Sequence, residues 1–258
     1  MKKLFTCICI IAAIMTAGCR VGRDLPPESY LFTIVDCGHF VHSYWIYDAI
    51  CLKPAGDKGA LAIGIPESAY YVWFASVRKK RELYLDLCRK YDDFDYKEIM
   101  DMPSTIYIDS RPERIFSGIS FRSVDLVCDK DFDEQHPAGT SLADISQLHS
   151  KSAMPLFDKM RGGQKEFMQS EIRNIIVEEL PFAKPLDELT EYDLAVMSSS
   201  VFYNFKAGWP EYDKFVLAYI DIDPPAAPGA YTFTVTMTTT DGDIFEDSLT
   251  IEWNGSDI

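Results

Sequence analysis

Strict alternation of apolar and polar residues near the C-terminal end constrains the fold of this chain more than any other feature. From Tyr231 to Met237 the odd-numbered residues are large and apolar, whereas the even-numbered ones are threonine. Because successive side chains of a strand point to opposite faces, this segment predicts a half-buried strand. After Asp241-Gly242 a second alternating segment runs from Phe245 to Trp253, so the sequence predicts a β-hairpin.

The register of this hairpin follows from its loop length. A three-residue loop, Thr240–Gly242, pairs Met237 with Phe245 and keeps the large apolar side chains on one face. A two-residue loop would instead set Met237 opposite Glu246 and mix the faces. We therefore predict the longer loop, with Gly242 in the left-handed conformation of a type I turn followed by a bulge.

Apolar runs elsewhere predict further short strands. Phe215–Ile222 is apolar on both faces and predicts a central strand. Ile119–Cys128 changes its apolar phase near Arg122-Ser123, which predicts a bulge. The remaining candidates are Tyr30–Asp36, Val41–Ile50, Ala60–Ile65 and Ala69–Val77. Many short strands separated by Gly and Pro turns predict a mainly β fold, specifically an immunoglobulin-like antiparallel β-sandwich.

Helices are expected as insertions into this sandwich. Lys79–Tyr91 carries apolar residues at helical spacing. Gln164–Leu180 also favours a helix, although Ile172–Val177 within it fits a strand as well. A short helix is predicted within Pro185–Val196.

The N-terminal residues 1–18 have the organisation of a secretory signal. Lys2 and Lys3 precede the uncharged run Leu4–Met15, and small residues follow it. As a helix this run would span about 18 Å, against a hydrocarbon core of roughly 30 Å. We therefore predict a signal that is cleaved off, and not a permanent transmembrane segment.

The signal ends in Thr16-Ala17-Gly18-Cys19, which resembles the lipobox of bacterial lipoproteins. The resemblance implies that Cys19 is acylated and becomes the first residue of the mature protein. Several fatty chains would anchor the protein durably to a membrane. The alternative is an ordinary signal with Cys19 as an incidental thiol. Acidic residues that would direct such a lipoprotein to the cell surface do not follow Cys19, which favours the periplasmic face of the outer membrane.

Behind the anchor we expect a tether and one folded unit. Residues 19–28 contain two prolines and are interpreted as the tether, and residues 29–258 as a single elaborated β-sandwich domain. The alternative division is an N-terminal α+β part, 29–112, and an immunoglobulin-like part, 113–258.

The charge of the mature chain excludes one class of partner. After loss of residues 1–18, 23 basic and 40 acidic residues remain, a net charge of −17. Such a surface repels phosphate backbones, so no nucleic-acid partner is predicted.

Four cysteines remain after removal of the signal and acylation of Cys19. They are Cys37, Cys51, Cys88 and Cys128. In an oxidising compartment they can form disulfides in three connectivities, or stay buried as small apolar thiols. The sequence leaves both alternatives open.

Asp129, Asp131 and Asp133 have the one-three-five spacing that opens a calcium-binding loop. The later positions do not match a calcium-binding loop, because Glu134 occupies the position that requires glycine and Thr140 the one that requires a bidentate carboxylate. We favour a turn in which the aspartates bind backbone amides. No metal or cofactor is therefore predicted, and calcium at these three carboxylates is kept as the weaker alternative.

No arrangement of catalytic residues is evident, and none is predicted. The sequence contains no nucleophile elbow, no His-Glu-x-x-His and no glycine-rich phosphate loop. His39 and His42 lie three residues apart in extended chain and should point to opposite faces. The other histidines are His136 and His149.

Two surface features could contact a partner. The basic run Arg78–Arg81 is read as a solvated helix start or loop that could also touch an acidic partner. Tyr70, Tyr71, Trp73 and Phe74 could form a sugar-stacking platform, with half of them expected in the core.

Three segments carry a family resemblance across most of the mature chain. They are Ile65-Pro66-x-x-Ala69-Tyr70, the run from Asp129 through His136-Pro137-Ala138-Gly139-Thr140-Ser141-Leu142, and the Asp241-Gly242 hairpin. In these the chain resembles a group of uncharacterised Bacteroidetes lipoproteins with an immunoglobulin-like β-sandwich. The resemblance implies that fold and an envelope location, and it implies no activity. Met154–Leu194 has no counterpart in it.

Three functional classes follow from these observations. The leading hypothesis is a lipid-anchored, non-enzymatic binding or interaction module of the cell envelope, whose partner is an envelope protein or a glycan. The second is a glycan-binding or glycan-hydrolysing component, and the third a calcium-stabilised structural domain. The fold alone does not choose among them.

Overall fold

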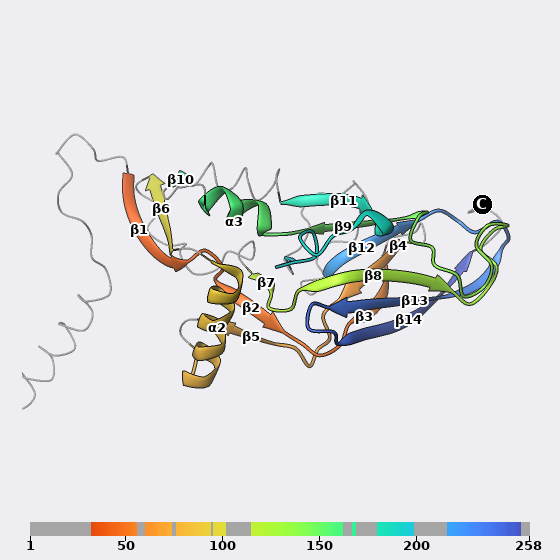
Figure 1. The fold of residues 1–258 in the computed structure, drawn as a ribbon, viewed down its shortest axis with the longest axis horizontal. Helices are drawn as coiled ribbons and strands as arrows, with labels where there is room; N and C mark the ends of the chain where they lie inside the picture. The colour runs from red at the N-terminus through yellow and green to blue at the C-terminus, as the bar shows by residue number, and fades with distance from the viewer. Residues whose placement is uncertain are drawn as a thin grey trace, which may run out of the picture.

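The computed structural model describes the backbone of residues 32–55, 60–73, 76–93, 95–101, 115–161, 167–168, 180–198 and 216–253. The fold is mainly β, as predicted (Figure 1). In chain order the strands are β1 Phe32–His39, β2 Ser43–Ile46, β3 Cys51–Ala55, β4 Ala60–Gly64, β5 Tyr70–Trp73, β6 Asp95–Asp101, β7 Ile115–Ser117, β8 Phe121–Cys128, β9 Ser146–Lys151, β10 Phe167–Met168, β11 Pro181–Pro185, β12 Val216–Ile222, β13 Gly229–Thr239 and β14 Ile244–Trp253. The helices are α2 Arg78–Tyr91, α3 Met154–Arg161 and the 3-10 turn η3 Leu186–Glu188.

Two sheets are fully antiparallel. The larger has the strand order β11-β9-β12-β4-β3, with β12 at its centre, so the prediction of a central strand at this position is confirmed. The other has the order β14-β13-β8. Strands β3 and β4 come from the first half of the chain and β12 from the second, so the two halves share the larger sheet.

Two smaller sheets lie toward the N-terminal part of the fold (Figure 1). Their strand orders are β1-β6-β10 and β5-β2-β7. Each contains one parallel pair, β10 with β6 and β2 with β7.

The hairpin formed by β13 and β14 has the predicted register. Met237 lies opposite Phe245, and the Thr239 amide donates to the Asp243 carbonyl at 2.8 Å. Gly242 has a φ of +96°, as expected for the left-handed position of the loop. The pairing of β13 with β8 shifts between Thr238 and Thr239, which confirms the bulge near Arg122.

Residues of both antiparallel sheets form one buried hydrophobic cluster. Its members include Leu61, Ile63, Leu126, Leu148, Leu217, Ile220, Phe233, Val235, Met237 and Phe245. A second cluster joins α2, α3 and β2, with Tyr44, Tyr84, Phe116 and Phe157 among its members. The apolar alternation of β13 therefore marks the main core, and the amphipathic face of α2 marks the second one.

The helix predictions are confirmed only in part. Helix α2 begins one residue before the predicted start and ends at the predicted residue. Within Gln164–Leu180 the described residues Phe167–Met168 form β10, because main-chain pairing with Glu98 and Ile99 of β6 overrides the helical spacing. Ile172–Val177 lies outside the described residues.

The helix expected within Pro185–Val196 is reduced to the three residues of η3. It stops at Leu189, whose backbone is extended, and the chain continues as a turn in which the Leu194 amide donates to the Thr190 carbonyl. Helix α3 was not predicted.

Among the described residues, no helix has both the length and the apolar character needed to span a bilayer.

Candidate functional site

An open recess of about 440 Å³ lies where four separate parts of the chain meet, one of which is the connection between β2 and β3 with Tyr47 and Asp48. The other three are the tip of the β13–β14 hairpin, the connection between β7 and β8, and Lys90 near the end of α2. Clefts of this size suit small ligands. The predicted hairpin loop therefore contributes to a concave surface.

Hydrogen bonds beneath the recess fix its floor. The Tyr91 hydroxyl donates to the Gly118 carbonyl at 2.8 Å and accepts from Ser120 at 3.1 Å. Burial raises the pKa of Tyr91 to about 12, so the phenol stays neutral and keeps donating. A Cβ added to Gly118 would lie 2.7 Å from Ile46 Cδ1 and 3.0 Å from the Trp45 carbonyl oxygen, so a larger residue here would require its neighbours to shift.

The walls of the recess combine charge with one apolar side chain. Asp48, Asp241 and Asp243 line it together with Lys90, whose Nζ lies 3.7 Å from Asp241 Oδ2. Ile244 lies on the same surface and is 66% exposed, an unusual position for a large aliphatic side chain. The arrangement suits a ligand that offers hydrogen-bond donors or positive charge beside an apolar group.

A second cluster brings together His39, Cys88 and Asp93. Their ligand-type atoms all lie within 4.8 Å of one another. His39 ends β1, Cys88 lies in the last turn of α2, and Asp93 follows two residues after that helix. This grouping was not predicted from the sequence, because Cys88 and Asp93 lie five positions apart and His39 belongs to a distant strand.

The end of α2 explains how Asp93 reaches Cys88. Asp92 adopts a left-handed conformation with φ 57°, and the Asp93 amide donates to the Cys88 carbonyl at 2.8 Å. This helix cap turns the chain back over its last turn. Asp93 Oδ2 then accepts from the Val41 amide at 3.1 Å, which fixes the carboxylate against the β1–β2 connection.

Aromatic side chains surround this cluster. The Tyr84 ring packs edge-on against His39, and the Tyr84 hydroxyl donates to the Val41 carbonyl at 2.8 Å. The Tyr44 ring packs against Tyr84. Burial, and next the charge of Asp93, raise the pKa of the Cys88 thiol to about 12.

The aspartates proposed for calcium bind separate backbone amides. Asp129 Oδ1 accepts from the Thr232 amide, and Asp131 Oδ1 from the Ala138 amide. Asp133 Oδ1 accepts from the amides of Gln135 and His136. These contacts favour the hydrogen-bonded turn over convergence on one cation.

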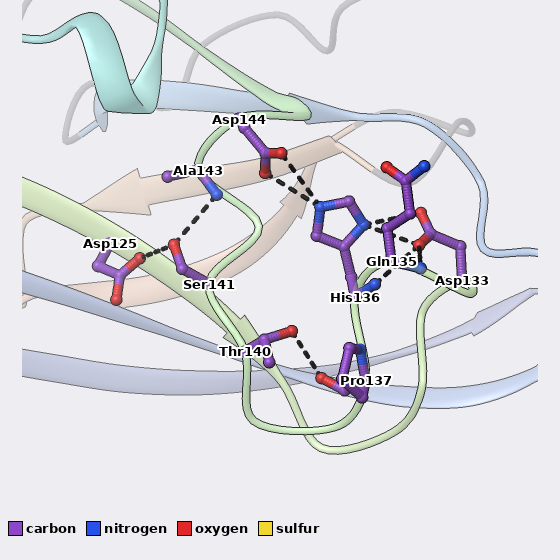
Figure 2. Close-up of polar contacts among 9 residues, drawn as sticks. All are labelled: Asp125, Asp133, Gln135, His136, Pro137, Thr140, Ser141, Ala143 and Asp144. Carbon is purple, nitrogen blue, oxygen red and sulfur yellow. Dashed lines mark hydrogen bonds and ion pairs between the residues drawn. The ribbon is translucent and has the colours of Figure 1, made fainter.

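His136 is the centre of this loop (Figure 2). Its Nδ1 lies 2.8 Å from Asp133 Oδ1, and its Nε2 lies 3.1 Å from Asp144 Oδ1. The hydrogen bond to Asp133, and next that to Asp144, raise the pKa of His136 above its ordinary value. The imidazole thus joins both ends of the loop. This link was not predicted from the sequence, which placed His136 only within the turn.

The structure describes the side chains of only some of the cysteines that were considered for disulfides. Cys88 and Cys128 are each 2% exposed and carry free thiols. For these two the structure describes buried thiols, the arrangement of the second alternative. Cys51 begins β3, and Cys37 belongs to β1 at a position whose side chain is not described; Cys19 lies outside the described residues.

The aromatic platform is only partly assembled. Tyr70 and Tyr71 of β5 are exposed, but Lys80 Nζ lies 4.6 Å from the centroid of the Tyr70 ring. Tyr71 packs edge-on against Trp45, with 5.6 Å between ring centroids. Phe74 lies outside the described residues. The basic run forms the first turn of α2, where Arg78 pairs with Glu82, in agreement with the helix-start alternative.

Comparison with known proteins identified no matching family model, curated protein or solved structure.

Proposed function

We propose that this chain is a lipid-anchored protein of the cell envelope, held by fatty acids on Cys19, and that its folded part is a binding module. The lipobox-like sequence supports the anchor, and the periplasmic face of the outer membrane is the proposed location. The two antiparallel sheets around one core support an immunoglobulin-like sandwich.

The recess beneath the hairpin tip is the proposed recognition site, and its construction is the observation that carries the proposal. Four distant chain segments form it, buried hydrogen bonds fix its floor, and Ile244 is left exposed beside Asp241 and Lys90. A preformed site of this kind binds its ligand without the entropy cost of ordering its own side chains. The acidic groups favour a ligand with hydroxyl or ammonium donors, such as a glycan or a peptide of the envelope.

Binding to arrays of envelope glycans and peptides tests this proposal with the native, detergent-solubilised protein. Ile244→Glu and Asp241→Lys change exposed side chains of the recess and should each weaken the captured ligand at least tenfold. Glu252→Lys alters the charge at the other end of the same strand and is the matched control. Equal binding by all three variants, or binding of no array component by the parent protein, would overturn the proposal.

Glycan hydrolysis is the second candidate, because Asp48, Asp241 and Asp243 share the recess. Two carboxylates can act as acid and base in glycoside hydrolysis. The same bound glycan should then be cleaved on incubation, and Asp243→Asn should abolish cleavage while preserving binding. An intact glycan after prolonged incubation leaves binding alone as the function.

A further inference from the structure

We propose that His39, Cys88 and Asp93 form a binding site for a divalent metal ion of the zinc class. The site is separate from the recess, because Cys88 and Lys90 lie on nearly opposite sides of α2, about 160° apart around its axis. The inference therefore does not depend on the function proposed for the recess.

The geometry of the three side chains supports coordination of one ion. Their ligand atoms lie within 4.8 Å of one another, so one central ion can contact all three after small side-chain adjustments. The three residues come from β1, α2 and the segment after α2. The helix cap holds Asp93 over Cys88, and the Val41 amide holds its carboxylate, so the site is largely positioned before any ion binds.

The chemistry of the ligands selects the class of ion. A thiolate and an imidazole with one carboxylate suit Zn²⁺ and related transition metals, whereas Ca²⁺ and Mg²⁺ require oxygen ligands. Because the thiolate is the ligand, the thiol proton passes to the buffer when the metal–sulfur bond forms. Three protein ligands leave a fourth position of a tetrahedral ion for water or an external ligand.

The three residues are buried to different degrees, and aromatic rings pack beside them. Cys88 is 2% exposed, whereas His39 and Asp93 are half-buried, so an ion could enter from their side. Rings of Tyr44 and Tyr84 pack around the cluster and would limit the access of solvent to the metal–sulfur bond.

Cobalt binding to the full native protein in detergent tests the site. After removal of metals with a chelator, Co²⁺ should bind at one equivalent per chain and give a thiolate-to-metal charge-transfer band. Zn²⁺ should abolish the band by displacement, and excess Ca²⁺ should leave it unchanged. Absence of the band, or its removal by Ca²⁺, would overturn the proposal.

Three variants assign the ligands. Cys88→Ser should eliminate the charge-transfer band, and His39→Gln and Asp93→Asn should each weaken Co²⁺ binding at least tenfold. Cys128→Ser is the matched control, because Cys128 is equally buried and also has a free thiol. A band that survives in Cys88→Ser, or that disappears in Cys128→Ser, would contradict the assignment.

A measurement on the unaltered protein covers the case in which Cys88→Ser does not fold. Zn²⁺ should slow alkylation of Cys88 at least tenfold more than alkylation of Cys128, as mapped by mass spectrometry. Equal slowing of the two thiols would show general stabilisation without coordination and would overturn the proposal.

Discussion

Gly242 occupies a backbone conformation that side chains rarely adopt, with a φ of +96°. An added Cβ would meet nothing within 4 Å, so a substitution here changes conformational energy without creating a clash. Gly242→Ala should lower the free energy of unfolding by about 1 kcal/mol, measured by urea denaturation. Gly242→Asn should cost less, because asparagine tolerates the left-handed region. Equal losses in the two variants would contradict this explanation.

His136 should make stability depend on pH. Because its pKa is raised in the folded protein, its contribution is complete below the unfolded value of about 6.5 and is lost as the pH rises through the folded value. His136→Gln should therefore lower the melting temperature by roughly 2–5 °C near pH 6, and the difference should shrink toward about pH 9.

Thermal unfolding followed by circular dichroism at both pH values checks this expectation. Although burial opposes it, the hydrogen bond from His136 lowers the pKa of Asp133, so Asp133 remains charged at both values. Gln135→Ala, at an exposed neighbouring position, is the control and should give no pH-dependent difference. A difference that grows toward alkaline pH would refute the assignment.

For individual residues, the sequence predicted the turn formed by the aspartates but not the position of His136 at its centre. The spacing of Asp129, Asp131 and Asp133 indicated side chains that bind amides, which the structure supports. The contact of His136 with Asp144 depends on how the loop folds back, and local spacing contains no information on that. The grouping of His39 with Cys88 was hidden for the same reason.

Among the secondary-structure elements, strand β13 has two faces that contribute differently to the stability of the fold. Phe233 is fully buried, with its ring 5.5 Å from that of Trp253, whereas Thr234 is half-exposed and bonds Ser248 across the hairpin at 2.8 Å. Phe233→Ala should lower the free energy of unfolding by about 3–5 kcal/mol. Thr234→Ala should cost less than about 1 kcal/mol.

Chemical denaturation of the two variants measures the contrast between adjacent residues. Similar losses would contradict the expectation that the core face contributes most of the stability of the strand. The slope of the unfolding free energy against denaturant concentration should be the same for the unaltered protein and both variants, because each unfolds from the same fold.

Elements with strong periodicity were predicted well. The hairpin, β12 and α2 have clear apolar patterns, because each places one face or both faces in a core. The failures have a different origin. Strand β10 is two residues long and owes its conformation to pairing with β6, and α3 is a short helix of eight residues. Neither length is enough for a periodic pattern to stand out.

For the whole molecule, the anchor on Cys19 is the central prediction. Mass spectrometry of the native protein should find an N-terminal peptide that begins at Cys19 and carries fatty acyl groups. Cys19→Ser should move the protein out of the membrane fraction, because one or no fatty chain gives only marginal binding. An unmodified start at another residue would contradict the prediction.

Asp247 lies on the otherwise apolar face of β14, and its Oδ2 accepts from the Leu52 amide of β3 at 2.7 Å. Both strands lie at the margins of their sheets. An unprotected margin offers main-chain donors and acceptors to any passing extended segment. By occupying the Leu52 amide with a side chain, the protein removes a site for intermolecular strand addition between two copies of the chain.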